Sequence, residues 1–306
     1  MKWQTKLKWE LPQKDEITYK SKLLFLGSCF SDNLGKNFLN HGFDAVVNPF
    51  GVLFNPISIA NVLNVVDFYW DENRVVERDS KFVHLDAHSK VNSKSKSDLL
   101  KELSTNSKTL AEDLNGATHL FITLGTAWVY EKERGVVANC HKQDSKQFSR
   151  RLLRIDEMER ALKAAITNLL ETNQALKIYF TVSPIRHTKD GLVDNNRSKA
   201  RLIEVVHALA QENNSINYLP AYELMMDELR DYRFYAEDLI HPSKAAVNYI
   251  LEYFRSHFFS SKTAEIYVKH EKLLKLKEHK QINTENSDLS YKMKAMEEEI
   301  KKLKSF

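Results

Sequence analysis

The chain has 306 residues, of which 42% are hydrophobic and 10% aromatic, a composition that supports a sizeable core and excludes a largely disordered protein. Its net charge is +4, and residues 261–306 carry three of these charges with eleven Lys against eight Asp or Glu. Residues 1–260 are therefore nearly neutral, which excludes a strongly basic nucleic-acid-binding body, and no apolar run approaches the ~20 residues of a membrane span.

Apolar runs of strand length alternate with helical patterns over most of the chain. This alternation predicts an α/β fold in which helices cover a mainly parallel central sheet. The predicted strands are residues 23–27, 43–47, 119–124, 177–182 and 216–219. The predicted helices are residues 30–41, about 56–66, 96–114, 156–173, 196–213 and 243–258.

Two segments depart from the alternation and define the expected domains. Residues 72–115 read as an insertion, with a small hairpin formed by 75–78 and 82–85 before a helix. The second segment, residues 261–306, has no Gly or Pro and reads as a charged helical tail, interrupted near 283–290, that follows a domain formed by residues 1–260.

The end of this tail has apolar residues alternately four and three apart, the a/d spacing of a coiled coil over about two heptads. They are Leu289, Met293, Met296, Ile300 and Leu303. Three alternatives stay open for residues 262–306: self-association or binding of a partner helix, packing on the body, and disorder.

The first predicted strand stops at Gly27-Ser28, and a helical pattern begins at once with Phe30, Leu34 and Phe38. A serine at a strand-to-helix turn stands at the carboxyl edge of the sheet, where α/β proteins bind ligands. It also lies beside the free N–H groups of the helix, an environment that suits a nucleophile whose reaction develops an oxyanion. The simpler interpretation of Ser28 is a turn and helix cap.

A second polar segment lies just before the last predicted helix of the body. Asp238 and His241 are three residues apart in a tight loop followed by Pro242 and Ser243. In such a loop the carboxylate can orient the imidazole and stabilise its protonated form. The pair alone is more typical of a polar loop in which Pro242 and Ser243 begin a helix, whereas together with Ser28 it indicates serine-based acyl transfer.

These motifs resemble the first and last blocks of the SGNH/GDSL hydrolase superfamily, and GSCFS at 27–31 is similar to the motif that names the GSCFA family, a distant branch of it. The resemblance covers roughly residues 20–258. It continues through NPFGVLFNP at 48–56, LGTAW at 124–128, SPIRH at 183–187 and NNRSKA at 195–200. It implies a three-layer sandwich of the SGNH-hydrolase-like, flavodoxin-like type and a Ser28–His241–Asp238 triad that needs no cofactor or metal.

The oxyanion donors are the point at which the chain departs from the wider superfamily. We expect the Ser28 amide and the Gly51 amide to donate, although Asn-Pro-Phe-Gly is also a natural turn. The usual Gly-x-Asn-Asp block is replaced by Gly125-Thr126-Ala127-Trp128, a change that the resembled family shares. Thr126, Asn48 and Asn55 are the candidate substitutes for the missing asparagine.

Other polar residues follow strand ends and are expected to shape the substrate pocket. Arg186 and His187 follow the fourth strand, where Arg186 either binds a substrate carboxylate or phosphate or pairs with Asp190 or Asp194. Trp128 is expected to be a buried aromatic, with stacking on a sugar as the alternative. The polar residues of the following segment are expected to cap the next helix, with substrate contact as the alternative: Asn195, Asn196, Ser198 and Lys199.

The two cysteines exclude a disulfide framework and are too few for a structural zinc site. Cys29 reads as a small buried residue, with a reactive thiol as the alternative. The histidines lack the spacing of a catalytic metal site. The N-terminal residues lack the apolar core and cleavage site of a signal peptide, so a cytoplasmic location is the expectation.

The expected function is an ester hydrolase that removes a small acyl group, such as acetyl, from a carbohydrate or other polar substrate. This substrate class rests on analogy with the superfamily alone. The alternatives are an acyltransferase with the same triad and a non-catalytic binding module on the same fold. The expected partner is a small-molecule or carbohydrate ester, with no nucleic acid and no membrane.

Overall fold

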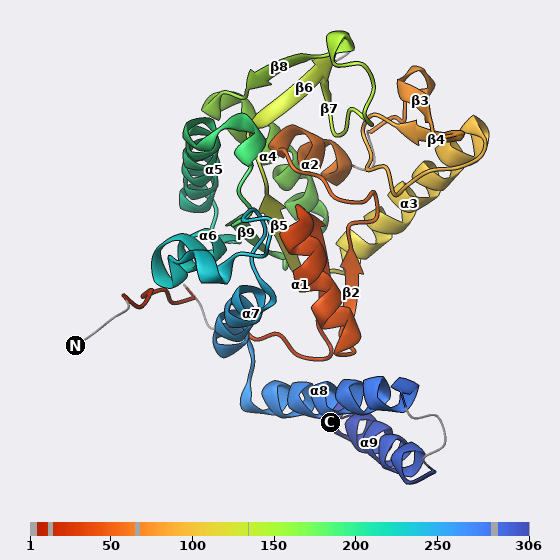
Figure 1. Cartoon of the computed structure of the whole chain (residues 1–306), viewed down its shortest axis with the longest axis vertical. Coiled ribbons are helices and arrows are strands. Elements are labelled where there is room, and N and C mark those ends of the chain that lie inside the picture. The colour runs from red at the N-terminus through yellow and green to blue at the C-terminus, as the bar shows by residue number, and fades with distance from the viewer. Residues whose placement is uncertain (1–4, 12–14, 65–67, 134, 283–286, 306) are drawn as a thin grey trace.

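A five-stranded parallel sheet lies at the centre of the protein, whose computed structural model describes residues 5–11, 15–64, 68–133, 135–282 and 287–305 (Figure 1). From edge to edge the strands are β10 (Ile216–Tyr218), β9 (Lys177–Val182), β5 (His119–Leu124), β1 (Lys22–Gly27) and β2 (Asp44–Val47). Every neighbouring pair is parallel. All six residues of β5 are buried, as in a strand covered on both faces, and such strands read as near-continuous apolar runs.

The order of the strands fixes where ligands are expected to bind. Counted along the chain, the five strands lie in the order 2-1-3-4-5, the order of a flavodoxin-like doubly wound sheet. The chain reverses direction across the sheet between β1 and β5, and the crevice outside the carboxyl ends of such strands is the usual ligand site. Gly27 of β1 pairs with Thr123 of β5 at this end. The residues that follow these two strands therefore border the crevice.

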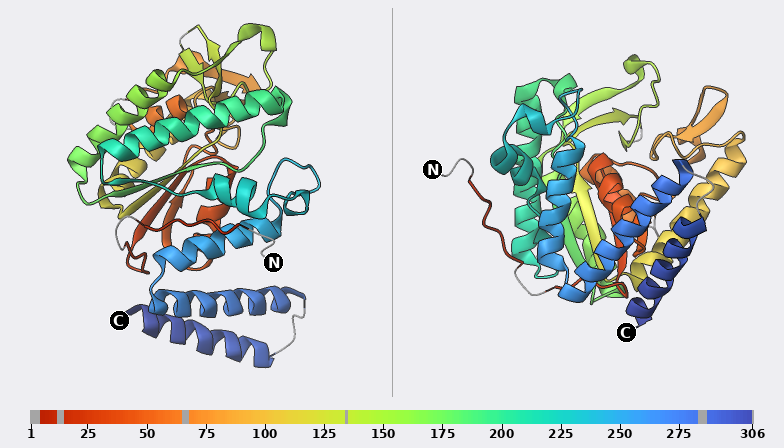
Figure 2. Two further views of the ribbon diagram at one scale, coloured as in Figure 1. Left: turned by 90° about the vertical axis from the view of Figure 1, so that its left-hand side faces the viewer. Right: turned by 60° about the horizontal axis from the view of Figure 1, so that its bottom comes forward.

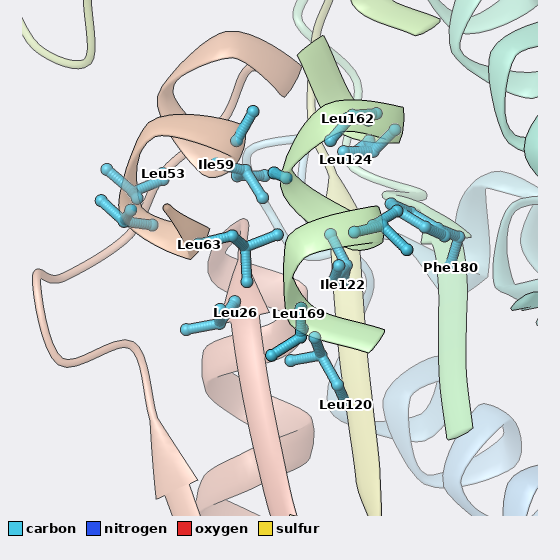
Figure 3. Packing of buried hydrophobic residues seen from close by; sticks show 14 of the residues in the cluster. Leu26, Leu53, Ile59, Leu63, Leu120, Ile122, Leu124, Leu162, Leu169 and Phe180 are labelled. Atoms are coloured by element: carbon cyan, nitrogen blue, oxygen red, sulfur yellow. The ribbon is translucent and has the colours of Figure 1, made fainter. Parts of the chain in front are cut away.

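Helices cover both faces of the sheet, so the predicted three layers are confirmed. One face packs against α1 (Cys29–Asn40) and α7 (Lys244–Phe258). The other face packs against α2 (Pro56–Leu63), α3 (Lys96–Gly116), α4 (Ile155–Thr172) and α5 (Leu192–Glu212). Figure 3 shows this second core, in which Leu26, Leu120 and Ile122 of the strands meet Leu63 of α2 and Leu169 of α4.

A small antiparallel sheet, which the sequence did not predict, follows β5 directly. It consists of β6 (Trp128–Lys132), β7 (Gly135–Val137) and β8 (Ser149–Leu152), with β6 in the middle. These strands are short and only partly buried, and β6 and β8 carry charged residues, so they lack the apolar run that marks a core strand. A short helix, α6 (Ala221–Glu223), and the π-helical turn Leu224–Leu229 were also not predicted.

The segment 72–115 contains the predicted hairpin, formed by β3 (Val75–Arg78) and β4 (Lys81–His84). A buried ion pair between Arg74 and Asp86 closes this hairpin, with 2.6 Å between Nε and Oδ2. The rest of the segment is not separate from the body, because the buried leucines of α3 belong to the same core as the central sheet.

The tail forms two antiparallel helices, α8 (Ser261–Ile282) and α9 (Ser287–Ser305), that lie beside the end of the body away from the small sheet (Figure 2). Tyr267 of α8 stacks on His41 with 3.9 Å between ring centroids and donates a hydrogen bond to Asn37. Ile300 of α9 is buried against α8. Part of the predicted a/d stripe is therefore used within the chain, whereas the side chains of Leu289 and Leu303 lie outside the described residues. The interruption expected at 283–290 is wrong for residues 287–290, which begin α9, and residues 283–286 lie outside the described residues.

Candidate active site

Ser28 lies at the turn between β1 and α1, where the sequence predicted it. Gly27 precedes it with φ +123, and a Cβ at this position would lie 2.2 Å from the Thr123 carbonyl oxygen, so the turn requires glycine. The Ser28 hydroxyl caps α1 by accepting a hydrogen bond from the Phe30 amide at 3.3 Å. Ser28 is 1% exposed. Its hydroxyl thus lies at the positive end of the helix but is largely covered by protein.

Asp238 and His241 form the pair that their spacing predicted. The Asp238 Oδ2 lies 2.6 Å from the His241 Nδ1, while Oδ1 accepts the amides of His241 and Ile240 at 3.0 and 2.9 Å. The backbone amide of His241, its imidazole and the Ile240 amide lower the pKa of Asp238 to about 2. Because an ionised carboxylate only accepts, Nδ1 carries a proton, and in the neutral imidazole Nε2 is then the acceptor. This is the tautomer that a general base needs.

The loop that carries this pair is attached to the loop after β9. The Arg186 amide donates to the Ile240 carbonyl at 3.1 Å. The neighbouring His187 is mostly buried, and its pKa is lowered to about 4 by burial and by the nearby charges of Lys199 and His241. His241 is thereby placed at the carboxyl edge of the sheet. No hydrogen bond joins it to the Ser28 hydroxyl within the described residues.

The two backbone amides that were expected to donate to an oxyanion are both engaged elsewhere. The Ser28 amide donates to the Thr123 carbonyl at 3.0 Å and so continues the ladder between β1 and β5. The Gly51 amide donates to the Asn48 carbonyl at 2.7 Å and closes the Asn-Pro-Phe-Gly turn. These two predictions are therefore wrong for this structure, in which Gly51 instead supplies positive φ and close contact with His88.

Of the two asparagine candidates, Asn48 has the amide that remains available. Its Oδ1 accepts the Gly27 amide at 2.8 Å, and its buried Nδ2 has no hydrogen-bond partner among the described residues. Asn55 instead caps α2, because its Oδ1 accepts the Ser58 amide and its Nδ2 donates to the Ser58 hydroxyl, both at 2.9 Å. A buried amide without a partner is rare in folded proteins and indicates a missing acceptor.

The loop after β5 is held by contacts on both sides. The amides of Gly125 and Thr126 donate to the Phe54 carbonyl at 2.8 and 3.0 Å. The Thr126 hydroxyl accepts the Trp128 amide and lies 3.1 Å from the Ser198 hydroxyl. The Thr126 amide and hydroxyl therefore both have protein partners in this structure.

Lys199 is a functional candidate whose position the sequence did not reveal. The prediction that residues 195–199 cap a helix is wrong, because α5 begins at Leu192. Lys199 lies fully buried on α5 and donates to the carbonyls of Gly125 and Ser183 at 2.6 and 2.7 Å. Desolvation lowers its pKa to about 7. Lys199 thus joins the loop after β5 to the loop after β9. Asn195, Lys199 and Leu202 are four and three residues apart, so they lie on the same, buried face of α5.

Arg186 lies against aromatic rings rather than an acidic partner, and Cys29 is partly buried, as its interpretation as a small packed residue requires. The Arg186 guanidinium lies over the rings of Tyr232 and Tyr235, 5.6 and 5.3 Å from their centroids, beside a cavity of about 270 Å³. Asp194 pairs with Arg197 instead, and the side chain of Asp190 lies outside the described residues. Burial raises the pKa of the Cys29 thiol, which disfavours the reactive thiolate.

A second cavity, of about 460 Å³, lies between the small antiparallel sheet and the carboxyl edge. Asn55, Thr126 and His187 line it from the edge, and Trp128 lines it from β6. Within the described ranges, no three His, Cys, Asp or Glu side chains are grouped so as to hold a metal ion. None of the helices in those ranges is long and apolar enough to cross a membrane.

Comparison with known proteins identifies a family. The sequence model of the GSCFA family matches residues 22–254, which include Ser28, Asn48, Asp238 and His241. A search of curated proteins finds no match.

Proposed function

We propose that the chain, which belongs to the GSCFA family, is a serine-dependent ester hydrolase of the SGNH/GDSL type. Its substrate is a carbohydrate or other polar molecule that carries a small acyl group such as acetyl. The observation that carries the proposal is the Asp238–His241 pair, with 2.6 Å between carboxylate and imidazole, at the same sheet edge as Ser28. The strand order supports the proposal as well, because doubly wound folds bind ligands in the crevice at the carboxyl ends of their strands, where Ser28 lies after β1.

In the proposed reaction, His241 Nε2 accepts the Ser28 hydroxyl proton as Oγ attacks the acyl carbon. The tetrahedral intermediate collapses when the imidazolium returns this proton to the leaving alcohol, which leaves an acyl group on Ser28. Water then attacks the acyl carbon with His241 again as base, and the carboxylic acid departs as Ser28 regains its proton. Asp238 holds Nδ1 and stabilises the imidazolium.

Asn48 is the proposed oxyanion donor in place of the asparagine that the superfamily block lacks here. Its Nδ2 is buried and without a partner among the described residues, and its Oδ1 is fixed by the Gly27 amide next to Ser28. A donor held in place by its own side-chain oxygen is oriented in advance for the charge that develops in the transition state.

The mechanism requires His241 to approach Ser28 when substrate binds. The side chains of Asp238 and His241 are 46% and 48% exposed, so the pair has room to move as a unit. Catalytic hydrogen bonds are often long or absent in free enzymes and form only in the substrate complex.

A non-catalytic binding protein on the same fold is the second candidate. The 1% exposure of Ser28 and the engaged amides of Ser28 and Gly51 favour it. In such a protein, Ser28 is the cap of α1 and the Asp238–His241 pair stabilises its loop.

Fluorophosphonate labelling followed by peptide mass spectrometry separates the two candidates. The full chain is compared with Ser28→Ala and His241→Ala, and circular dichroism checks that each variant is folded. An adduct on Ser28 that depends on His241 supports the hydrolase. No adduct on folded protein favours the binding protein, and an adduct on another residue contradicts the proposed mechanism. Addition of acceptor alcohols to an acetate-release assay then distinguishes hydrolysis from acyl transfer.

A further inference from the structure

The cavity of about 460 Å³ beside the small sheet has a size typical of sites for small molecules. One wall is the carboxyl edge of the central sheet, with Thr126 and His187. The opposite wall is aromatic, formed by partly exposed side chains of Trp128, Tyr130 and Phe148. β6 carries the first two of these rings, so the unpredicted sheet supplies a rigid aromatic wall next to the proposed catalytic edge.

Two short connections join this cavity to the proposed catalytic residues. The Leu53 amide donates to the Gly27 carbonyl at 2.9 Å, and the next residue, Phe54, lines the cavity. The Phe54 ring meets the His187 ring edge-on with 6.2 Å between centroids. His187 lines the cavity and also lies within the electrostatic influence of His241. A molecule in the cavity therefore touches two segments, one hydrogen-bonded to the Ser28 turn through Leu53 and one hydrogen-bonded to the Asp238–His241 loop through Arg186.

The charged residues around the cavity all have the same sign. Lys142, Arg150 and Lys189 line it, and no Asp or Glu is among its described lining residues. The Arg150 guanidinium stacks 4.3 Å from the centroid of the Trp128 ring, which holds one cation against the aromatic wall. Lys142 and Lys189 are exposed. A concave site with charge of one sign concentrates ligands of the opposite charge.

We propose that this cavity binds the alcohol part of the substrate and that this part is a sugar carrying a carboxylate or a phosphate. The aromatic wall accepts the apolar face of a sugar ring, whereas the three cations accept its anionic group. That the sugar is part of a substrate rests on the proposed hydrolase activity. The binding of an anionic sugar is independent of that activity and can be measured without turnover.

The test uses full-length Ser28→Ala protein and isothermal titration calorimetry with three sugars. Methyl β-D-glucuronide and glucose 6-phosphate carry the two anions, and methyl β-D-glucoside is the neutral control. We expect at least one anionic sugar to bind about tenfold or more tightly than the glucoside, the effect of one hydrogen bond to a charged group. The anion that binds more tightly identifies the group.

A charge-reversal pair tests whether this cavity is the site. Lys142→Glu/Lys189→Glu in the same protein is expected to abolish the preference for the anionic sugar. Lys94→Glu/Lys101→Glu changes two exposed lysines that do not line the cavity, gives the same change in net charge, and is expected to keep the preference.

Three results would overturn the proposal: equal binding of charged and neutral sugars, no binding of either anionic sugar to folded protein, or a preference that survives in Lys142→Glu/Lys189→Glu. If that variant does not fold, the titrations are repeated with the Ser28→Ala protein at increasing salt concentration. The preference for the anionic sugar must then shrink as the ionic strength rises. Sugar binding together with an unlabelled Ser28 would overturn the hydrolase and leave the anionic-sugar site standing.

Discussion

The substitution Asn48→Asp tests the proposed oxyanion donor by replacing its buried amide with a carboxyl group of the same shape, whose negative charge opposes an oxyanion and so acts in the same direction as the lost donor. Aspartate keeps the oxygen that accepts the Gly27 amide at 2.8 Å, and it tolerates the φ of +44 that Asn48 adopts. It removes the Nδ2 donor, which has no other partner among the described residues. Loss of one such donor costs about 2.7–4 kcal/mol of transition-state stabilisation, or about 10²–10³ in kcat.

The assay is hydrolysis of 4-nitrophenyl acetate by the full chain, with kcat and KM measured separately. We expect kcat to fall and KM to change little, because the removed interaction forms only in the transition state. Asn213→Asp is the matched control: its Oδ1 also accepts a backbone amide, that of Ser215, but it precedes β10 at the opposite edge of the sheet. If Asn48→Asp keeps kcat within about threefold of wild type while Ser28→Ala abolishes activity, Asn48 is not the donor.

Three further predictions follow from contacts described above. Asp238→Asn removes the acceptor that holds the His241 tautomer and is expected to lower kcat by up to about 10⁴. The melting temperature should change little, since the side chains of Asp238 and His241 are half exposed. A fall in kcat of less than about tenfold would contradict the role of Asp238. Burial lowers the pKa of His141 to about 4, so this histidine lowers the free energy of unfolding as the pH falls from about 6.5 towards 4, by up to about 1.4 kcal/mol per pH unit. Urea unfolding of wild type and His141→Asn over this range should show a shallower slope for the variant, and parallel slopes would refute the assignment. Because α8 and α9 pack on each other and on the body, light scattering should give the monomer mass for the full chain, whereas a dimer that dissociates on deletion of residues 261–306 would show that the tail self-associates.

The central sheet and the three polar residues of the proposed triad were predictable from sequence because each has a local signature. β5 and β9 match their predicted bounds to the residue, since strands buried on both faces are apolar runs that end abruptly. Ser28 and Asp238–His241 stand next to helix starts, where polar residues interrupt a regular pattern. The prediction that they lie at one edge rested on these positions and on the family resemblance.

The details of the site depend on contacts between distant segments, which a single sequence does not reveal. The Ser28 amide is taken by Thr123, and this follows from the register of β1 against β5. Lys199 is a charged residue that would ordinarily be assigned to the surface, and only its contacts with two strand-end carbonyls explain its burial. The small sheet escaped prediction because its half-exposed strands have neither a continuous nor a strictly alternating pattern.

The contact between α8 and the far end of α1 has a practical consequence. Ser28 precedes the first residue of α1, whereas Asn37 and His41, which Tyr267 contacts, lie at the other end, about 18 Å away along a 12-residue helix. Figure 1 shows the tail hairpin at the opposite end of the molecule from the small sheet. An affinity tag or biosensor surface coupled through α9 would therefore leave the crevice and its neighbouring cavity facing free solution, which makes this helix the attachment point of choice for immobilised binding assays.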